Sequence, residues 1–487
     1  MIFSTIEFAV FMALVFLLYW SVPARFRWIL LLLSNIWFYA CYEVKYLIVL
    51  LLTTVISYVA AILIEKQTLF KKKKGLFVIG IVLTLSFLLV CKYLNFTIYA
   101  IQRVLSHLAL PMHPFTLKLL VPVGISFYTF EMVSYLADVY SGKIPAERNF
   151  FHYAVFVSFF PNISSGPIER AGHFLPQLKE EKRFDYDTVV YGTRLLLLGL
   201  VKKIVIADML SKYVDAVFEH VTEQTGICFL WATLLYTFQI YCDFSGYSDM
   251  AVGLAGMLGF ELPRNFKGPY LASSVKEFWS RWHISLSTWL RDYIYIPLGG
   301  NKRGSFRRDC NLLVTFLISG LWHGASFTFI FWGFLHGIYQ ITENHLRKKK
   351  PTTEHQEGPG SVSAVRSAFR TALGTLVTFC LVSFAWLFFR ARAISEALFA
   401  VTHMFSDLSL SMAMARMGMT ARSVLKTFLV ILFIMVFDII NEKRDVLKEI
   451  SRLPAWLRWT GYFLTGLVIL ALSAHNGVSQ EFIYFRF

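Results

Sequence analysis

Long stretches without a single charged residue are the feature of this sequence that most restricts its fold. A bilayer core about 30 Å thick is crossed by roughly 20 apolar residues in a helix. Stretches free of Asp, Glu, Lys and Arg occupy residues 8–24, 28–42, 46–64, 75–91, 149–168, 224–242, 310–342, 371–389 and 459–480. Shorter or less apolar segments occur at 119–130, 188–206, 250–260 and 427–437. The sequence therefore predicts an all-α polytopic membrane protein with about 11 transmembrane helices, plus re-entrant and interfacial helices.

The charge content excludes an ordinary soluble protein. Only 16% of the 487 residues are charged, whereas soluble domains have about 25%. The net charge of +16 does not indicate nucleic-acid binding, because the basic residues lie in short loops between apolar stretches, as the positive-inside rule requires. The six cysteines are far apart in the sequence and contain no CxxC pair, so neither a disulfide framework nor a metal site is predicted.

Loop charge also predicts the topology. Arg25 and Arg27 mark one basic loop, and residues 65–75 form another, whereas residues 43–45 carry only one Lys. Because basic loops face the cytoplasm, the N-terminus is expected outside. Residues 442–458 are basic as well, so the last span would deliver the C-terminus to the outer face.

We divide the chain into a membrane core over residues 1–345, a flexible cytoplasmic loop over residues 346–370, and C-terminal membrane helices over residues 371–487. The loop is polar and rich in Pro, Gly and Ser, which is typical of linkers. The segments 121-VPVGISFYTF-130 and 161-PNISSGPI-168 interrupt apolar stretches. Broken backbone at membrane depth is tolerated only where protein or a water-filled cavity covers it, so these segments predict a cavity.

His323 lies within the longest uncharged stretch, between Trp322 and Gly324. Ionisable residues in membrane segments are expensive and mark functional sites, and a neutral imidazole can take a proton from a hydroxyl. A core histidine bonded to a carbonyl is the structural alternative. His336, in the same stretch, is interpreted as such a core residue.

His283 lies in the segment 272–301. Ser274 and Glu277 fit a capping box, and the aromatic residues that follow recur at helical spacing. This pattern predicts an amphipathic helix at the cytoplasmic interface, where most of the aromatics would serve as anchors.

A third cluster, 239-QIYCDFSGYSDMAVG-253, places many polar side chains beside an apolar stretch. They must be satisfied inside the protein, either as a structural network or as the lining of a reaction chamber.

The order of several motifs resembles one known family. These motifs are 122-PVGISFYTFEMVSYLADVY-140, 166-GPIER-170, 241-YCDFSGYSDMAVG-253, 278-FWSRWHISLSTWLRDYIYIPLGGN-301 and 321-LWHGASFTFIFWGFLHG-337. Together they are similar to the membrane-bound O-acyltransferases (MBOAT), in the bacterial branch of alginate and peptidoglycan O-acetylases and the teichoic-acid D-alanylation enzyme. The resemblance extends to about residue 340. Glu131 stands where the family usually has Gln.

The resemblance implies a ring of membrane helices around a central channel. It implies that an acyl group moves from a cytoplasmic thioester to a hydroxyl on the outer face, with acetyl-CoA as the expected donor and no metal. By resemblance, His323 is the family's invariant histidine, which we interpret as the general base, and His283 is its second histidine. We assign substrate binding to residues of these motifs and of the polar cluster 239–253: Trp322, Gln239, Asp243, Ser245, Ser287, Arg291 and Asp292.

The resemblance also extends to the C-terminus, 482-FIYFRF-487. Similar aromatic C-termini occur in this branch, so the Tyr484 hydroxyl is a candidate transient acyl acceptor; an interfacial aromatic belt is the structural alternative. The expected surroundings are membrane lipid of the bacterial cytoplasmic (inner) membrane, a polysaccharide acceptor, and an outer-face transferase or small membrane subunit.

The sequence thus favours O-acetylation of a cell-envelope or secreted polysaccharide. D-alanyl transfer to teichoic acid from a carrier protein is the alternative within the family. A transporter or channel without covalent chemistry is the alternative from another class; it predicts inverted repeats, which the sequence does not show.

Overall fold

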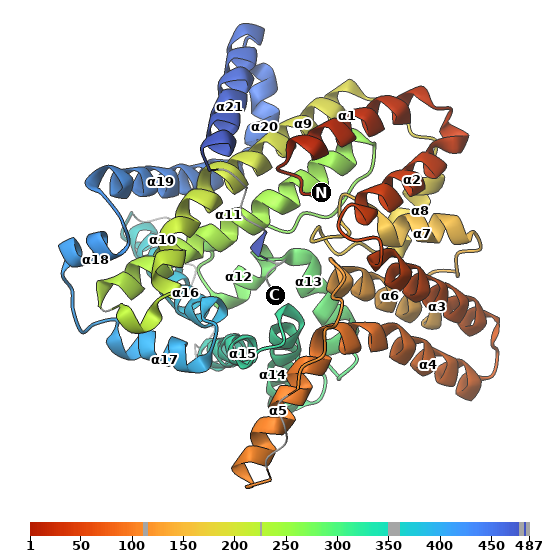
Figure 1. Ribbon diagram of the computed structural model, residues 1–487, viewed down its shortest axis with the longest axis horizontal. Coiled ribbons are helices and arrows are strands. Elements are labelled where there is room, and N and C mark those ends of the chain that lie inside the picture. The colour runs from red at the N-terminus through yellow and green to blue at the C-terminus, as the bar shows by residue number, and fades with distance from the viewer. Residues whose placement is uncertain (111–114, 225, 349–360, 477–481, 484–487) are drawn as a thin grey trace. The chain divides into compact units, whose positions relative to one another are not determined.

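The computed structural model describes residues 1–110, 115–224, 226–348, 361–476 and 482–483 (Figure 1). Over these residues the chain forms helices joined by loops, and no strand occurs among them. The all-α prediction is therefore confirmed.

Six helical segments among the described residues are long and apolar enough to cross a membrane. They correspond to predicted apolar stretches, including the weaker one at 427–437. The six are Tyr46–Lys66, Phe70–His107, Ile227–Met257, Arg366–Arg390, Ala421–Lys443 and Ala455–Leu472. The stretches 8–24, 28–42 and 149–168 form shorter helices, and 310–342 is divided between the helices Gly304–His323 and Phe327–Lys348. The structure therefore gives a multi-pass membrane protein without fixing the predicted number of spans.

The first of two compact units comprises Met1–Leu198 and Tyr247–Pro263. In it α3, α4 and α6 pack against one another. The helices up to this boundary are α1 (Ile6–Ser21), η1 (Ala24–Phe26), α2 (Arg27–Ala40), α3 (Tyr46–Lys66), α4 (Phe70–Leu88), η2 (Leu89–Tyr93), α5 (Leu94–His107), α6 (Ile125–Tyr140), α7 (Phe150–Ser158), α8 (Ala171–Lys179) and α9 (Tyr186–Leu200).

The second unit comprises Gly199–Gly246 and Arg264–Phe487 and contains both candidate histidines. Its helices are η3 (Val201–Ala207), α10 (Asp208–Phe218), η4 (Val221–Glu223), α11 (Ile227–Met257, up to Gly246), η5 (Pro269–Leu271), α12 (Val275–Arg281), α13 (Ile284–Leu290), η6 (Arg291–Tyr295), α14 (Gly304–His323), α15 (Phe327–Lys348), α16 (Ser361–Arg390), α17 (Ile394–His403), α18 (Leu410–Arg416), α19 (Ala421–Lys443), α20 (Val446–Glu449), η7 (Ile450–Arg452) and α21 (Ala455–Asn476).

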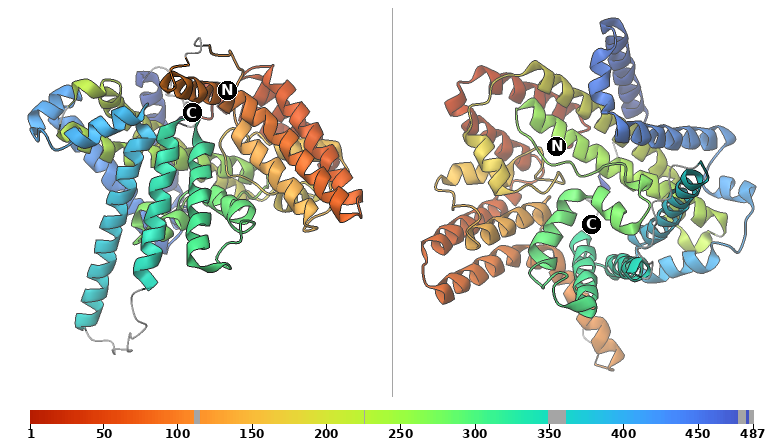
Figure 2. Two further views of the ribbon diagram at one scale, coloured as in Figure 1. Left: turned by 90° about the horizontal axis from the view of Figure 1, so that it is seen from below. Right: turned by 180° about the vertical axis from the view of Figure 1, so that it is seen from behind.

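Helices α14, α15 and α16 run side by side in the second unit (Figure 2). The closest approach is between α14 and α15, where each helix presents a glycine to the other. A Cβ at Gly320 would overlap the carbonyl oxygen of Phe329, and one at Gly333 would overlap that of Phe316. Because neither position has room for a side chain, the two backbones touch directly. This contact fixes the C-terminal end of α14, where His323 lies.

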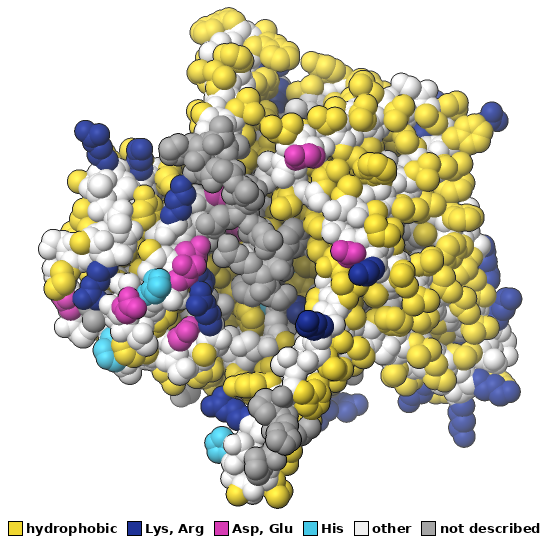
Figure 3. Space-filling model, in the orientation of Figure 1, with side chains coloured by type: hydrophobic (Ala, Val, Ile, Leu, Met, Phe, Trp, Pro, Cys, Tyr) yellow, Lys and Arg dark blue, Asp and Glu magenta, His cyan; other side chains and the backbone are white. Residues whose placement is uncertain are grey.

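Large hydrophobic side chains cover much of the visible surface (Figure 3). Leu17, Leu33 and Trp37 are each more than half exposed, as are Phe463 and Trp456 on α21. Exposed apolar area of this extent is unusual for a soluble monomer and is what contact with lipid tails requires.

Two details of the sequence prediction were wrong. The segment 272–301 is not one amphipathic helix, because it breaks at His283 into α12, α13 and the π-helical turn η6. Its aromatic stripe also faces protein, since Phe278, Trp282 and Trp289 are buried. The predicted loop 346–370 is helical at both ends, because α15 continues to Lys348 and α16 begins at Ser361. Residues 349–360 lie outside the described part.

Candidate active site

His283 forms the turn between α12 and α13 and is completely buried. Its backbone adopts φ 42° and ψ 55°, a left-handed conformation that costs a non-glycine residue about 1–3 kcal/mol. Asn265 stabilises this turn: its carbonyl oxygen accepts from Ile284 N at 3.0 Å, and its Oδ1 accepts from Ser285 N at 3.1 Å. Strain held in place by neighbouring hydrogen bonds is characteristic of functional sites.

The short helix that leads to His283 begins as the sequence predicts. Ser274 Oγ accepts a hydrogen bond from Glu277 N at 3.1 Å. Glu277 reaches back to Ser273, accepting from its N at 2.9 Å and its Oγ at 2.8 Å, so the cap is displaced by one residue from the ideal box.

His323 is the last residue of α14 and is 3% exposed. The helix ends there because Gly324 is extended, with φ −166° and ψ 153°. Aromatic rings enclose the imidazole: its centroid lies 4.9 Å from Trp322, 5.1 Å from Trp332 and 5.2 Å from Phe389. The predicted site residue Trp322 is therefore part of the wall around His323.

The fold brings the two histidines together. The ring centroids of His283 and His323 are 6.5 Å apart, and the Trp322 ring lies 5.9 Å from His283. Burial lowers the pKa of His283, which lies outside the six candidate spans, to about 3. His283 is therefore neutral at physiological pH, and a neutral ring can accept a proton or a hydrogen bond.

A cavity of about 850 Å³ lies beside this pair, bordered by α12, α13 and α14. Lys276, Arg291 and Arg308 contribute cationic groups to it, while Trp279, Leu312 and Phe316 contribute apolar surface. The predicted residues Ser287 and Arg291 line the cavity. Asp292 is bound to Arg291 Nε at 2.9 Å. An apolar cavity with a few cationic groups suits an amphiphilic anion.

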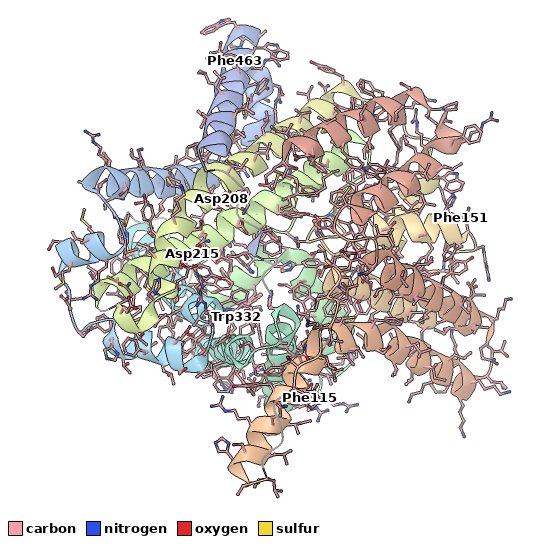
Figure 4. The ribbon with its side chains drawn as sticks, viewed as in Figure 1. Phe115, Phe151, Asp208, Asp215, Trp332 and Phe463 are labelled. Carbon is pink, nitrogen blue, oxygen red and sulfur yellow. The ribbon has the colours of Figure 1, made fainter. Side chains whose placement is uncertain are left out.

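Neither histidine lines this cavity. Trp279 lies at the cavity wall and packs against Trp332 with ring centroids 5.7 Å apart, and Trp332 in turn packs against His323 (Trp332 is labelled in Figure 4). The two indole rings, packed in series, therefore connect the cavity wall to His323. His336 accepts a hydrogen bond from Trp279 Nε1 at 3.2 Å, which agrees with its interpretation as a core residue.

The polar cluster on α11 divides into two groups. Tyr241 OH donates to Asp438 at 2.8 Å, and Asp243 pairs with Lys203 at 2.7 Å, so these side chains belong to an internal network. Ser245 Oγ and Gln239 Oε1 are buried and have no hydrogen-bond partner within the described chain. The same holds for Ser248 Oγ, which belongs to the first unit; in the second unit, Gln239 and Ser245 are the polar groups of the cluster that a bound molecule could use. Tyr484 lies outside the described residues.

Sequence reasoning missed several residues that build the site. Lys203 is buried and lies in the weak apolar stretch 188–206, so the rule that ionisable residues in apolar segments are functional candidates would have found it. Asn265 carried no signal, because its role depends on a contact with the turn at His283. The described residues contain no cluster of three or more His, Cys, Asp or Glu side chains able to hold a metal.

Comparison with known proteins gives consistent matches. The family model described as MBOAT, membrane-bound O-acyltransferase family, matches residues 144–384. The probable alginate O-acetylase AlgI of Pseudomonas putida is 36% identical over the full length of both chains. That of Pseudomonas aeruginosa is 39% identical over 83% of this chain and 75% of its own. The peptidoglycan O-acetyltransferase of Helicobacter pylori is 34% identical over 76% of this chain and 72% of its own.

Proposed function

Because this chain belongs to the membrane-bound O-acyltransferase family, we propose that it is an O-acetyltransferase acting on a cell-envelope or secreted polysaccharide. The acetyl group comes from cytoplasmic acetyl-CoA and is transferred to hydroxyl groups at the outer face. The enzyme resides in the bacterial cytoplasmic membrane with both termini outside. The names of its relatives, alginate O-acetylase and peptidoglycan O-acetyltransferase, support this class of acceptor.

The observation that carries the proposal is the enclosed histidine pair. His283 and His323 come from different helices, both are buried, and their centroids are 6.5 Å apart. Two buried ionisable side chains brought together from different helices are a recurring feature of functional sites.

In the proposed reaction, His323 is the general base. It takes the proton from the acceptor hydroxyl as the oxygen attacks the thioester carbonyl. A C–O bond forms, the C–S bond breaks, and the imidazolium returns the proton to the departing thiolate. A hydroxyl is a weak nucleophile until a base assists it, and such assistance contributes about 10²–10⁴-fold to the rate. His283 orients the donor or the acceptor.

The cavity beside the pair is the proposed donor entrance. Coenzyme A carries phosphates on a long thin arm, so cationic side chains at the entrance and apolar walls beyond them suit it. Lys276, Arg291 and Arg308 provide the charge, and Trp279 and Phe316 provide the walls. The thioester must pass the Trp279 and Trp332 rings to reach His323, so these side chains rotate when the donor binds.

Acyl transfer to the polysaccharide uses Tyr484 as a transient acceptor in this proposal. The support is that Ile483, the residue before it, is buried in the same unit as the histidines. An outer-face transferase or small membrane subunit would then receive the group. Gln239 and Ser245 are the proposed hydrogen-bond partners of the acceptor.

Substitution of His323 tests the proposal. In cells producing His323→Ala at wild-type membrane levels, base-releasable acetate on the polymer should disappear. His336→Gln is the matched control, because His336 is an equally buried histidine without a proposed role in the chemistry. Normal polymer acetate in His323→Ala would refute the assignment of the base.

The donor is tested separately with purified protein in lipid nanodiscs. Labelled acetyl-CoA should be consumed when an acceptor is present. Consumption only of a D-alanyl carrier protein would establish the alternative branch instead. Passage of a solute without any covalent product would establish a transporter.

A further inference from the structure

Phe482 and Ile483, two described residues of the C-terminal segment, are buried in the second unit. Phe482 is 0% exposed and Ile483 is 6% exposed. Ile483 N donates a hydrogen bond to Asp243 Oδ2 at 2.8 Å, across 240 residues of sequence. The Phe482 ring lies 5.9 Å from Phe244, the next residue on α11.

Asp243 is held from its other oxygen by a buried lysine. Lys203 Nζ lies 2.7 Å from Asp243 Oδ1 and 2.9 Å from Asp208 Oδ1. The exposure of these three side chains is 4% for Lys203, 4% for Asp243 and 7% for Asp208. Two carboxylates share one ammonium group, so Asp243 has negative charge left for a further donor. The main-chain N–H of Ile483 supplies that donor.

Two features of the local fold bring Lys203 close to Asp208 and Asp243. Lys203 lies in the π-helical turn η3, whose i→i+5 spacing brings Lys203 and Asp208 to the same side. On the opposite helix, Gly246 permits the approach, because a Cβ there would lie 2.8 Å from the carbonyl oxygen of Gly199 and 3.2 Å from Lys203 N. π-Turns are rare and occur mostly at functional sites.

The contact of Ile483 with Asp243, which we call the C-terminal anchor, lies close to His283. Phe244 packs against the Phe482 ring on one side and edge-on against the His283 ring on the other, and the Phe244 and His283 centroids are 4.6 Å apart. A single ring therefore separates the C-terminal segment from His283.

We propose that the Lys203–Asp243 pair is a binding site for this chain's own C-terminal segment, and that both residues are positioning residues for acyl transfer. The inference builds on the proposed function. It replaces the assignment of Asp243 to substrate binding, since the Asp243 oxygens bind Lys203 and Ile483 N.

The hydrogen bond to Asp243 is donated by the main-chain N–H of Ile483, so a test must remove this N–H. Burial alone would lower the pKa of Lys203, but Asp243 and Asp208 raise it above its usual value, so the lysine remains charged and holds Asp243 oriented. A buried charged group that loses one partner is destabilised strongly. Ile483→Pro removes the N–H donor, whereas Ile483→Val retains it with a similar side chain.

The first readout is independent of activity. In full-length protein lacking its six native cysteines, Phe482→Cys reports burial of the segment through the rate of maleimide labelling in membranes. Labelling of Cys at position 482 should be slow in the Phe482→Cys protein and equally slow when Ile483→Val is added. It should rise about tenfold or more with Ile483→Pro or Asp243→Ala, since a hydrogen bond to a charged group is lost. Equal slow rates in all four proteins would overturn the anchor.

The second readout is acetate on the polymer. Ile483→Pro, in a chain with Phe482 intact, should lose most polymer acetate at normal protein levels. Fast labelling with full acetylation would show a docked segment without a positioning role and would overturn the proposal. If wild-type protein made no ester at all, the proposed function would fail while the labelling result would still report the anchor.

Discussion

The ring centroids of His283 and His323 lie 6.5 Å apart, although His283 occupies a strained turn and His323 a helix end. Each is fixed by its backbone: His283 through the Asn265 hydrogen bonds and His323 through the glycine contact between α14 and α15. The geometry of the pair therefore depends on residues that never touch a substrate.

The strained turn at His283 separates the role of the ring from that of the backbone. His283→Gly should have a higher melting temperature than His283→Ala, because both empty the space of a buried imidazole but only glycine adopts positive φ freely; both should lose most activity. Asn265→Ala should lower the melting temperature by removing the Oδ1 hydrogen bond to Ser285 N, at a cost of about 1–3 kcal/mol. Thermal unfolding in detergent, measured beside polymer acetate, checks both. An active His283→Gly enzyme would contradict a role for the ring.

The glycine contact makes a second prediction. Gly320→Ala should destabilise the protein and abolish activity, because its Cβ would overlap Phe329 O; overpacking costs about 1–3 kcal/mol or more. Gly466→Ala on α21 is the matched control, since nothing lies within 4 Å of a Cβ there. Melting temperatures of the two variants decide the matter. Equal values would show that α14 and α15 can separate at little cost.

The cavity predicts how the donor is held. Substituting Lys276 and Arg291 together by Gln should raise the KM for acetyl-CoA by about tenfold and change kcat little, because these groups bind phosphate away from the reacting carbonyl. Added salt should raise the KM for acetyl-CoA more in the wild-type enzyme than in the double variant, because salt screens the attraction between these cations and phosphate. An unchanged KM would exclude the cavity as the donor entrance.

Stability should depend on pH through His283. Burial lowers its folded-state pKa to about 3, whereas its pKa in the unfolded chain is about 6.5. Below about pH 6.5 the unfolded state therefore binds more protons at this residue, and stability falls with decreasing pH by up to about 1.4 kcal/mol per unit.

The comparison with His283→Gln isolates this contribution. The melting temperature of the wild type should fall more between pH 7 and pH 5 than that of the variant. Parallel curves for the two proteins would show that His283 is solvated or charged in the folded state.

The sequence predicted those parts of the site that depend on local pattern. His323 was identifiable as an ionisable residue within an uncharged stretch, Trp322 came from the family motif that contains His323, and the Ser274 cap could be read from spacing alone. The break at His283 was not predictable, because helical spacing of aromatics continues across it and the left-handed turn is stabilised by Asn265, which is distant in sequence. Ile483 was not predictable for the same reason, because its role appears only when residues 203, 243 and 483 meet, whereas Lys203 could have been found as an ionisable residue in an apolar stretch.

The backbone contact between Gly320 and Gly333 also limits how the enzyme can admit its substrates. Two helices whose backbones are in direct contact cannot shift or separate without losing this packing, so α14 and α15 must move together as a rigid body. In the proposed donor route, access to His323 then depends on rotation of the Trp279 and Trp332 side chains, and the rate of the catalytic cycle would be limited by how fast these two side chains change rotamer.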